Sequence, residues 1–317
     1  MFSTTQDWNK YIDQKGGHVR GSELRELRFG VYQRIEKLRG RPLLVYASDF
    51  LGQDDNSTSN AIDLSDIDGF TDLAGSVDGN EVDILLHSPG GRPDATERIV
   101  YILRNHFDKV HFIVPHSAYS AATMLALSGD TITIHPSATL GPIDPQIGGI
   151  PARSIKRGFE KVRDLLKEEG PEALPAYIPL IEKYSLDLLE LCDDSEKLSK
   201  ELVTDWLTEY MYSNEKKDVQ IEEIVDYFSS YDKHLMHSRP LLFKKLKSLH
   251  LKIKIADKPL RKLIWEAYIM LNGFFNMTDF VKLYENAPDL SYGKQVQIET
   301  QQGATNKAAA GRKNFRL

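Results

Sequence analysis

Two short motifs in this chain combine the residue types that acyl-transfer chemistry requires. An apolar segment over residues 82–87 runs into a Ser-Pro-Gly-Gly turn that ends at Gly91, and Ser120 opens a helical segment 29 positions later. Attack on an amide carbonyl places negative charge on its oxygen, and a backbone N–H aimed at that oxygen stabilises the transition state by about 3 kcal/mol. The pattern predicts Ser120 as a nucleophile and the N–H groups of Gly91 and Ala121 as oxyanion donors, and so an acyl-transfer enzyme of the peptidase type.

Glycine and a helix start suit this chemistry for separate physical reasons. Two successive glycines let the backbone turn sharply and approach a substrate closely. The first N–H groups of a helix lie in a potential that favours an anion, and the alanines after Ser120 leave its hydroxyl unobstructed. Each motif alone is also typical of an ordinary turn or of a helix N-cap, so the order of the surrounding elements matters.

That order places both motifs at one edge of a predicted sheet. Strands are expected over residues 42–48, 82–87, 110–115 and 131–135, and helices over residues 23–38, 67–73, 94–105 and 120–128. A βαβ connection is right-handed, and open α/β sheets bind ligands beyond the carboxyl ends of their strands. An α/β fold would therefore bring Gly91 and Ser120 to one site.

Three motifs, in this order and at these spacings, resemble the serine dehydrogenase proteinase family, a group within the Clp-type and signal-peptide-peptidase serine peptidases. The resemblance covers about residues 31–255, and beyond residue 149 it depends mainly on helical character. The motifs are His87-Ser88-Pro89-Gly90-Gly91, Tyr119-Ser120-Ala121-Ala122-Thr123 and Gly141-Pro142-Ile143-Asp144-Pro145-Gln146.

The resemblance implies a crotonase-like (Clp protease-like) spiral of ββα units with a mostly helical C-terminal extension. It implies a serine peptidase that hydrolyses a peptide or an unfolded protein through an acyl-enzyme, without a cofactor. Relatives oligomerise and thereby shield their sites, so a homo-oligomer is expected. The apolar stretch over residues 240–249 would supply that contact or would pack within the subunit.

The proton acceptor for Ser120 is the least defined part of the predicted site. Clp-type relatives use a histidine shortly after the nucleophile, but residues 141–146 contain none, and Asp144 lies near that position. Signal-peptide-peptidase relatives use a lysine from a following helix, which needs desolvation to lower its pKa. Lys161, 41 residues after Ser120, is the expected base, with Lys156 and Asp144 as alternatives.

Three histidines near the motifs are further alternatives for the base. His87 and His116 flank the predicted pocket, and His135 ends a predicted strand, but none has an acidic neighbour in the sequence that would identify it as a base.

Composition narrows the class of protein. The 317 residues are 41% hydrophobic and 27% charged, which suits one large α/β domain with an extension. A net charge of −6 argues against a general nucleic-acid binder. One cysteine, Cys192, excludes an internal disulfide framework and a cysteine-rich zinc site, and suits a reducing cytoplasm. No apolar run reaches the roughly 18 residues of a membrane span, and no secretory signal is apparent, so a cytoplasmic protein without a membrane span, a metal or a cofactor is expected.

Four regions are expected along the chain. They are a flexible N-terminus over residues 1–20, a peptidase domain over 21–255, a helical extension over 256–294 and a disordered tail over 295–317. Later helices are expected over residues 152–169, 176–191, 194–212, 220–230, 240–248 and 258–284.

A non-proteolytic protein of the same fold is the rival interpretation. Oxyanion donors of crotonase-like proteins also stabilise thioester enolates in coenzyme A chemistry, and a chain that has lost catalysis would act as a scaffold. Enolate chemistry does not need a nucleophilic Ser120, so the reactivity of that serine separates the two interpretations.

Overall fold

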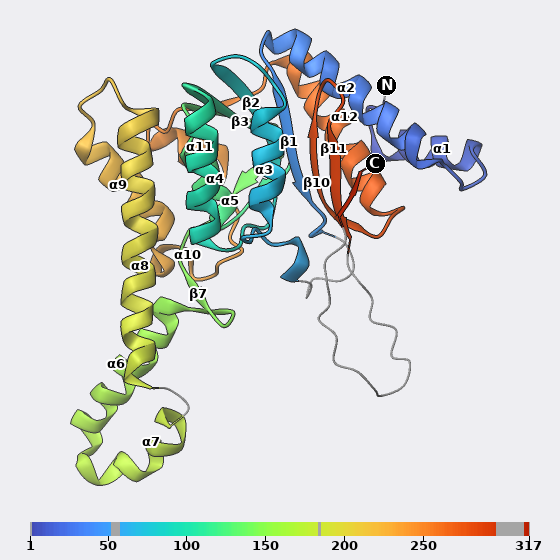
Figure 1. Ribbon diagram of the computed structural model, residues 1–317. Coiled ribbons are helices and arrows are strands. Elements are labelled where there is room, and N and C mark those ends of the chain that lie inside the picture. Colours follow the sequence, from blue (N-terminus) through green and yellow to red (C-terminus); the bar gives the residue numbers. More distant parts are fainter. Residues whose placement is uncertain (1, 52–57, 183–184, 296–313, 317) are drawn as a thin grey trace.

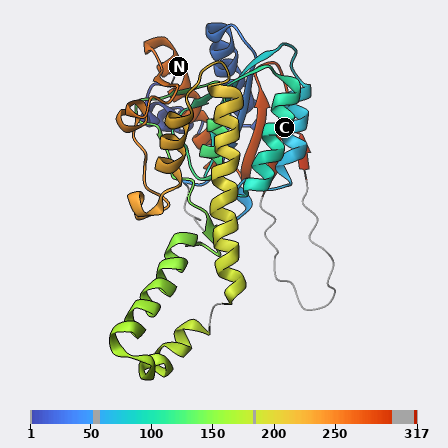
Figure 2. The same cartoon turned by 90° about the vertical axis from the view of Figure 1, so that its left-hand side faces the viewer.

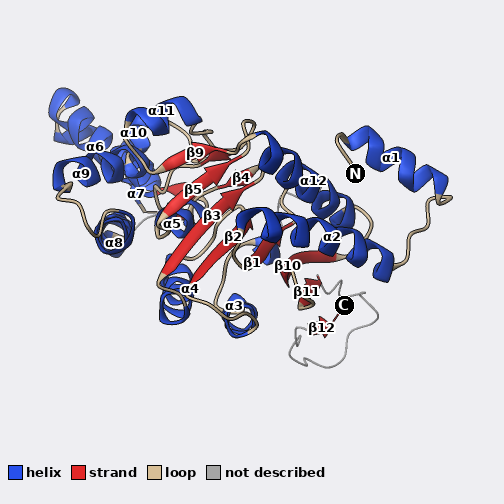
Figure 3. Ribbon diagram, turned by 90° about the horizontal axis from the view of Figure 1, so that it is seen from above, coloured by secondary structure: helices blue, strands red, loops and turns tan. Residues whose placement is uncertain are grey.

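A mixed eight-stranded sheet organises the chain (Figures 1 and 3). The computed structural model describes residues 2–51, 58–182, 185–295 and 314–316. The strand order is β12-β11-β10-β1-β2-β3-β5-β9. The five parallel strands are β1 (Leu43–Ser48), β2 (Glu81–His87), β3 (Lys109–Val114), β5 (Thr131–Ile134) and β9 (Ile253–Ile255). The first four confirm the strands expected from the sequence.

Helices cover both faces of the sheet, as Figure 3 shows. The pair α2 (Gly21–Arg39) and α12 (Lys258–Phe275) covers one face, while α3 (Asp66–Gly75), α4 (Pro93–His106) and α5 (Ala121–Leu127) lie on the other. In β1, Leu43 and Val45 belong to the core under α2 and α12, whereas Leu44 and Tyr46 belong to the core under α3 and α4. Because both faces are covered, the central strands are apolar runs without alternation.

A second, smaller layer continues the main strands. After β3 the chain forms β4 (Ser117–Ala118), and after β5 it forms β6 (Thr139–Leu140), which pairs in parallel with β4. Isolated bridges join Ser88 to Ala118, Ile62 to Gly91 and Leu140 to Leu241. The segment β3-β4-α5 thus contains a main strand, a short strand and a helix, which is the ββα unit expected, and single bridges take the place of the short strand after β1 and β2.

A helical arm extends from this body along α8, as two views at right angles show (Figures 1 and 2). The hairpin β7 (Gln146–Ile147) and β8 (Ile150–Pro151) leads into α6 (Ala152–Glu169), η2 (Pro171–Ala173) and α7 (Leu174–Ile181). The chain then returns through the long helix α8 (Leu186–Trp206). The expected break near residue 192 was wrong, because the extended Ser185 is the N-cap of one continuous helix that runs to Trp206.

The rest of the chain after α8 packs back on the sheet. Its first elements are η3 (Leu207–Met211), α9 (Asp218–Ser229), α10 (Tyr231–His234) and α11 (Phe243–Ser248). In the N-terminal half, the short helix η1 (Thr58–Asn60) precedes α3. In the apolar stretch over residues 240–249, Leu241 and Leu246 are buried in the main core. Packing within the subunit is therefore confirmed for these two leucines.

The N-terminus is not the flexible segment that we expected over residues 1–20. Helix α1 (Thr5–Gln14) begins with a capping box in which Thr4 and Asp7 bond each other's backbone. Its Trp8 is 7% exposed and packs against Gly273 of α12, where a Cβ would lie 2.2 Å from the indole ring. Burial of this aromatic ring orders a segment whose polar composition had suggested disorder.

The C-terminal region also differs from the expected helical extension and tail. Helix α12 ends at Phe275, and the chain continues as β10 (Phe280–Asn286), β11 (Ser291–Gln295) and β12 (Asn314–Arg316). Strand β10 pairs antiparallel with β1, so the extension belongs to the central sheet. Residues 296–313 of the expected tail lie outside the described residues, but residues 314–316 pair with β11. Local pattern missed these strands because β10, on which β11 pairs in turn, pairs with β1 more than 200 residues away in the chain.

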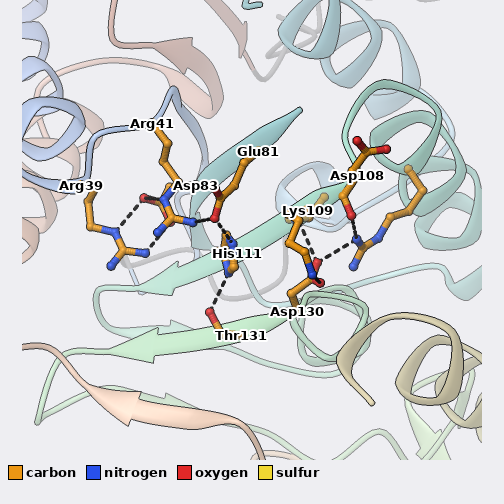
Figure 4. Close-up of polar contacts among 11 residues, drawn as sticks. Arg39, Arg41, Glu81, Asp83, Asp108, Lys109, His111, Asp130 and Thr131 are labelled. Carbon is orange, nitrogen blue, oxygen red and sulfur yellow. Dashed lines mark hydrogen bonds and ion pairs between the residues drawn. The ribbon is translucent and has the colours of Figure 1, made fainter. Parts of the chain in front are cut away.

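Ionic contacts hold the amino ends of the parallel strands, at the edge opposite to the motifs (Figure 4). Arg39 makes a bidentate contact with Asp83 of β2, with N–O distances of 2.7 and 2.9 Å. His111 bonds Glu81 and Thr131 through its two ring nitrogens, at 2.7 Å each. These contacts join α2, β2, β3 and β5.

Replacing Asp130, which lies just before β5, with asparagine should destabilise the fold by about 2 kcal/mol at neutral pH. Burial by itself raises the pKa of the Asp130 carboxyl, but the Val110 N–H and the Arg104 guanidinium outweigh burial and hold that pKa below its ordinary value. A carboxyl whose pKa is lowered on folding stabilises the protein above its unfolded pKa, and the effect is lost as pH falls through the folded pKa. Urea unfolding of the wild type and of Asp130→Asn should therefore give free energies that differ at pH 7 and converge as the pH falls through the folded pKa of Asp130; an equal difference at neutral and at acidic pH would contradict this account.

Candidate active site

The two motifs lie side by side at the carboxyl ends of β2 and β3. The Ser88 N–H donates to the Ser117 carbonyl at 3.2 Å, and the Tyr119 N–H donates to the Ser88 carbonyl at 3.1 Å. These bonds are the parallel bridge between Ser88 and Ala118. The structure therefore joins the Ser-Pro-Gly-Gly turn to the backbone that leads directly into Ser120.

Gly90 is the point of closest approach between the two turns. Its φ is +90°, and a Cβ there would lie 2.3 Å from the Tyr119 carbonyl oxygen and 2.8 Å from the Ser120 Cβ. Any side chain at this position would displace the serine turn, since these contacts are with backbone and with Cβ. Residue 90 must therefore be glycine, because a side chain at this position would collide with the turn that carries Ser120.

Ser120 has a strained backbone. Its φ and ψ are 49° and −125°, at the junction of β4 with the helix α5. A positive φ is unfavourable for a residue with a side chain and persists only where the surroundings impose it. Such strain at a sharp strand-to-helix turn presents a nucleophilic serine in other hydrolases. The residue is half-buried, while Ala121 after it is buried.

The Gly91 and Ala121 N–H groups are available as oxyanion donors. Ile62 donates to the Gly90 carbonyl at 2.7 Å and accepts from the Arg92 N–H at 2.8 Å. In a parallel bridge of this kind the N–H of the intervening residue, Gly91, is directed away from Ile62. Among the hydrogen bonds of the described residues, neither the Gly91 N–H nor the Ala121 N–H has an acceptor. Gly91 is exposed, so a substrate can reach it.

The third motif joins the serine turn and holds a buried carboxylate. The Gly141 N–H donates to the Ala118 carbonyl and to the Thr123 hydroxyl, both at 3.0 Å. Farther along this segment, Asp144 is 2% exposed. Its Oδ1 accepts a hydrogen bond from His237 Nδ1 at 2.9 Å, and its Oδ2 accepts one from Gln146 at 3.1 Å. A buried carboxylate is thus paired with an imidazole whose side chain is 25% exposed.

Sequence reasoning missed His237. It lies between α10 and α11, 117 residues after Ser120, in a stretch without a motif. The Leu241–Leu140 bridge carries this stretch to the third motif, where the Leu241 N–H donates to the Leu140 carbonyl at 2.8 Å. No local signal in the sequence would have identified this histidine.

The two lysines considered as bases lie on the arm. Lys156 Nζ is 2.6 Å from Asp193 and 2.8 Å from Glu196, and these carboxylates raise its pKa although burial opposes them. A lysine with a raised pKa keeps its proton and is a poor base. Lys161 is exposed on α6, where it lines a cavity of about 550 Å³ with Tyr177 and Ile181 of α7. The structure does not bring Lys161 together with Ser120.

The other histidines are engaged elsewhere. His87 is buried beside Phe50 and Tyr268, and burial, with His116 nearby, lowers its pKa to about 3. His116 stacks on Tyr268 with ring centroids 4.6 Å apart, and burial lowers its pKa. His135 stacks on Trp265 and accepts the Ser137 N–H. Among the described contacts, none of these three imidazoles reaches Ser120.

No helix in the described residues is both long enough and apolar enough to cross a membrane.

Comparison with known proteins identifies relatives of this chain. The family of ClpP-like SDH-type serine proteinases matches residues 72–266, more than half of the chain. An uncharacterized protein of Methanocaldococcus jannaschii, MJ1495, is 33% identical over 175 residues, which are 54% of this chain and 51% of that protein. A second protein of the same organism, MJ0137, is 41% identical over 80 residues, 25% of this chain and 28% of that protein. The chain thus spans about half, or less, of the length of the curated relatives it matches.

Solved structures of proteases are also similar. A mutant of the 1510-N membrane-bound stomatin-specific protease gives a TM-score of 0.36 at 19% identity, covering 62% of this chain and 75% of that one. A mutant of ClpP1 from Listeria monocytogenes gives a TM-score of 0.38 at 12% identity, covering 72% of this chain and 99% of that one. The family match, and not these two structures, carries the assignment. It confirms the resemblance read from the three motifs and the expected α/β fold of the ClpP type.

Proposed function

Because this chain belongs to the family of ClpP-like SDH-type serine proteinases, we propose that it hydrolyses peptide bonds through an acyl-enzyme formed on Ser120. One observation carries the proposal: the strained Ser120 turn packs against the Gly90-Gly91 turn, with two backbone donors unoccupied among the bonds of the described residues. A serine needs a base and an oxyanion site to attack an amide, and the surrounding segments offer both.

The oxyanion site consists of the Gly91 and Ala121 N–H groups. When the Ser120 oxygen attacks a carbonyl carbon, the carbonyl oxygen becomes an anion between these two turns. The N–H of Ala121 is at the start of α5, where the helix dipole adds to the stabilisation. An extended peptide would also pair with the Gly91 backbone on the side opposite to Ile62, as strands add to a free edge.

We assign the base to His237, oriented by Asp144. With its Nδ1–H bonded to the buried Asp144 carboxylate, the imidazole has an Nε2 without a hydrogen bond among those of the described residues, which can accept the Ser120 proton and return it to the leaving amine. Asp144 also stabilises the imidazolium formed in between. Support comes from the Asp144–His237 bond and from residues 140–141, which bond both Ala118, two residues before Ser120, and Leu241, four residues after His237. A contact between a base and its nucleophile often tightens only when a substrate binds.

The proposed substrate is a peptide or an unfolded protein. Ser120 is half-buried and Gly91 is exposed, so an extended chain can reach both turns. No step requires a cofactor. We also place the protein in the cytoplasm, in keeping with its buried free thiol at Cys192.

A fluorophosphonate probe tests the proposed function directly, since it reacts with an activated serine. Wild-type protein should be labelled at Ser120 and should cleave an unfolded protein such as casein, and Ser120→Ala should do neither. If neither protein is labelled but the wild type turns over an acyl-coenzyme A, the rival enolate chemistry is favoured. If the wild type shows neither peptidase nor acyl-coenzyme A turnover, a scaffold is favoured. The strained backbone at Ser120 favours the peptidase, because enolate chemistry does not need that residue.

We further propose that two copies associate through α6, as part of the expected homo-oligomer. Leu174 and Ile178 on the neighbouring α7 are 41% and 39% exposed, and the cavity beside α6 has apolar walls. One face of α6 carries Arg157, Lys161, Asp164 and Glu168 at helical spacing, and Glu160 on the same face pairs with Arg153 of its own subunit. Antiparallel packing of two such helices places Arg157 opposite Glu168 and Lys161 opposite Asp164 in both directions, and the small Ser154 and Gly158 on the same face allow close approach.

A charge swap tests this contact. Arg157→Glu with Lys161→Glu should weaken self-association at least about tenfold, because repulsion replaces attraction in a symmetric pair. Adding Asp164→Lys and Glu168→Lys to the same chain should restore it. Sedimentation velocity would measure the association of each protein. If the variant with only Arg157→Glu and Lys161→Glu associates as the wild type does, α6 is not part of the interface.

A further inference from the structure

A buried carboxylate outside the proposed catalytic groups collects contacts from the C-terminal hairpin. Asp66, at the start of α3, has no exposed surface. Lys282 Nζ on β10 lies 2.8 and 3.0 Å from its two oxygens, and Lys294 Nζ on β11 lies 3.3 Å from Oδ1. The Tyr284 hydroxyl also donates to Asp66. All three donors belong to strands beyond residue 266, where the family match ends.

The same carboxylate holds the segment before α3. Its Oδ2 accepts the Asp63 N–H at 2.7 Å, while the Asp66 N–H donates to the Asp63 carbonyl at 2.9 Å. Lys294 Nζ additionally contacts the Ser65 hydroxyl at 2.8 Å and the Ser65 carbonyl. The turn over residues 63–66 is therefore fixed by groups on β10 and β11.

This turn is covalently continuous with the residue that pairs with Gly91. Ile62 directly precedes Asp63 and is fully buried. It bonds both the Gly90 carbonyl and the Arg92 N–H, and a Cβ on Gly91 would lie 2.2 Å from its carbonyl oxygen. The direction of the Gly91 N–H is thus set by Ile62, and the position of Ile62 is set by a turn that Asp66 holds.

We propose that Asp66 and Lys282 are positioning residues for the oxyanion turn, so that the hairpin β10–β11 is a functional part of the active site. The inference rests on the proposed role of the Gly91 N–H. A small displacement of one oxyanion donor weakens its bond in the transition state more than it weakens substrate binding, so the loss should appear in kcat.

Lys282→Met is the informative change. It removes the closest cation from Asp66. Oδ1 then keeps Lys294 and Tyr284, whereas Oδ2 keeps only neutral donors, the Asp63 N–H and the Tyr46 hydroxyl at 3.5 Å. The carboxylate should then move toward Lys294 and away from the Asp63 N–H, which releases the turn next to Ile62.

Strand β10 provides a matched control in Glu285. This residue is also completely buried and also pairs with a cation, Arg28 of α2, with N–O distances of 2.9 and 2.6 Å. It lies on the opposite face of the strand from Lys282, and none of its hydrogen bonds among the described residues reaches the turn over residues 63–66. Glu285→Gln therefore disturbs a comparable ion pair without reaching Ile62.

Amide hydrogen exchange and kinetics together test the proposal. In Lys282→Met the Ile62 and Arg92 amides should exchange at least about tenfold faster, because their bonds open more readily. Turnover kcat should fall about tenfold, with KM within about twofold of the wild type. Glu285→Gln should lower the melting temperature but change neither the exchange of these two amides nor kcat. Asp66→Asn provides a second variant if Lys282→Met does not fold.

Wild-type exchange at Ile62 and Arg92 in a folded Lys282→Met or Asp66→Asn variant would overturn the inference, whatever the activity. Equal losses of kcat in Lys282→Met and Glu285→Gln would also overturn it, since general destabilisation would then explain both. If exchange rises as expected while the wild type shows no turnover that depends on Ser120, the proposed peptidase function fails and the coupling of the hairpin to the glycine turn stands.

Discussion

Ser120→Ala should abolish hydrolysis of an unfolded protein, with a loss of about 10⁴-fold or more in kcat. The Ser120 oxygen forms the bond to the acyl group in the proposed mechanism, and the neighbouring Tyr119 hydroxyl is bonded to the Thr139 hydroxyl at 3.0 Å. The fold should persist, because the side chain makes no hydrogen bond among those of the described residues and alanine is smaller. Turnover should be measured beside circular dichroism and the melting temperature of the same preparation.

The exposed Ser137 provides the control for this change. Ser137→Ala should keep both wild-type turnover and fluorophosphonate labelling. Wild-type turnover in Ser120→Ala would end the assignment of the nucleophile. A loss of turnover accompanied by a collapse of the melting temperature would instead show that the serine turn is needed for folding.

His237→Ala and Asp144→Asn should each lower kcat by about 10²- to 10⁴-fold, the usual contribution of a general base and of the group that orients it. In the double variant the losses should be far from additive, because the two side chains act as one unit with Ser120. The rates of all three variants, measured beside the wild type at one pH, would test the assignment.

Lys161→Met tests whether Lys161, rather than His237, is the base. This variant should retain wild-type kcat when it is measured at a protein concentration where its oligomeric state matches that of the wild type. His106→Ala, an exposed histidine at the end of α4, should also be unaffected. An inactive Lys161→Met beside an active His237→Ala would reverse the assignment. It would imply a conformation in which the arm brings the lysine to the serine turn.

Most of the site-forming turns were predictable because their signals are local. Gly90 and Gly91 follow an apolar strand, and Ser120 precedes small residues that open a helix. Glycine is needed where the backbone closely approaches another segment. At Gly90 an added Cβ would collide with the turn that carries Ser120. The parallel strands were equally readable, since strands that are covered on both faces are continuous apolar runs.

The proton acceptor was not predictable in the same way. Lys161 satisfied a spacing, but the helix that carries it projects along the arm, and spacing in the chain does not determine the direction of a helix. His237 satisfied no spacing, yet a bridge between Leu241 and Leu140 delivers it to Asp144. Residues that are distant in the chain meet through strand pairing, which a single sequence does not display.

The sequence by itself determined the family and the α/β class, and it led to the proposed roles of Ser120, Gly91 and Asp144, because all of these depend on residue types within short segments. Only the tertiary structure decided that Trp8 packs an ordered N-terminus against α12, that β10 and β11 extend the central sheet, and that Lys282 pairs with Asp66 in the segment next to Ile62. Each of these features is a contact between segments far apart in the chain. Their stability comes from burial and from ion pairs formed in the folded state, and neither leaves a local pattern in the sequence.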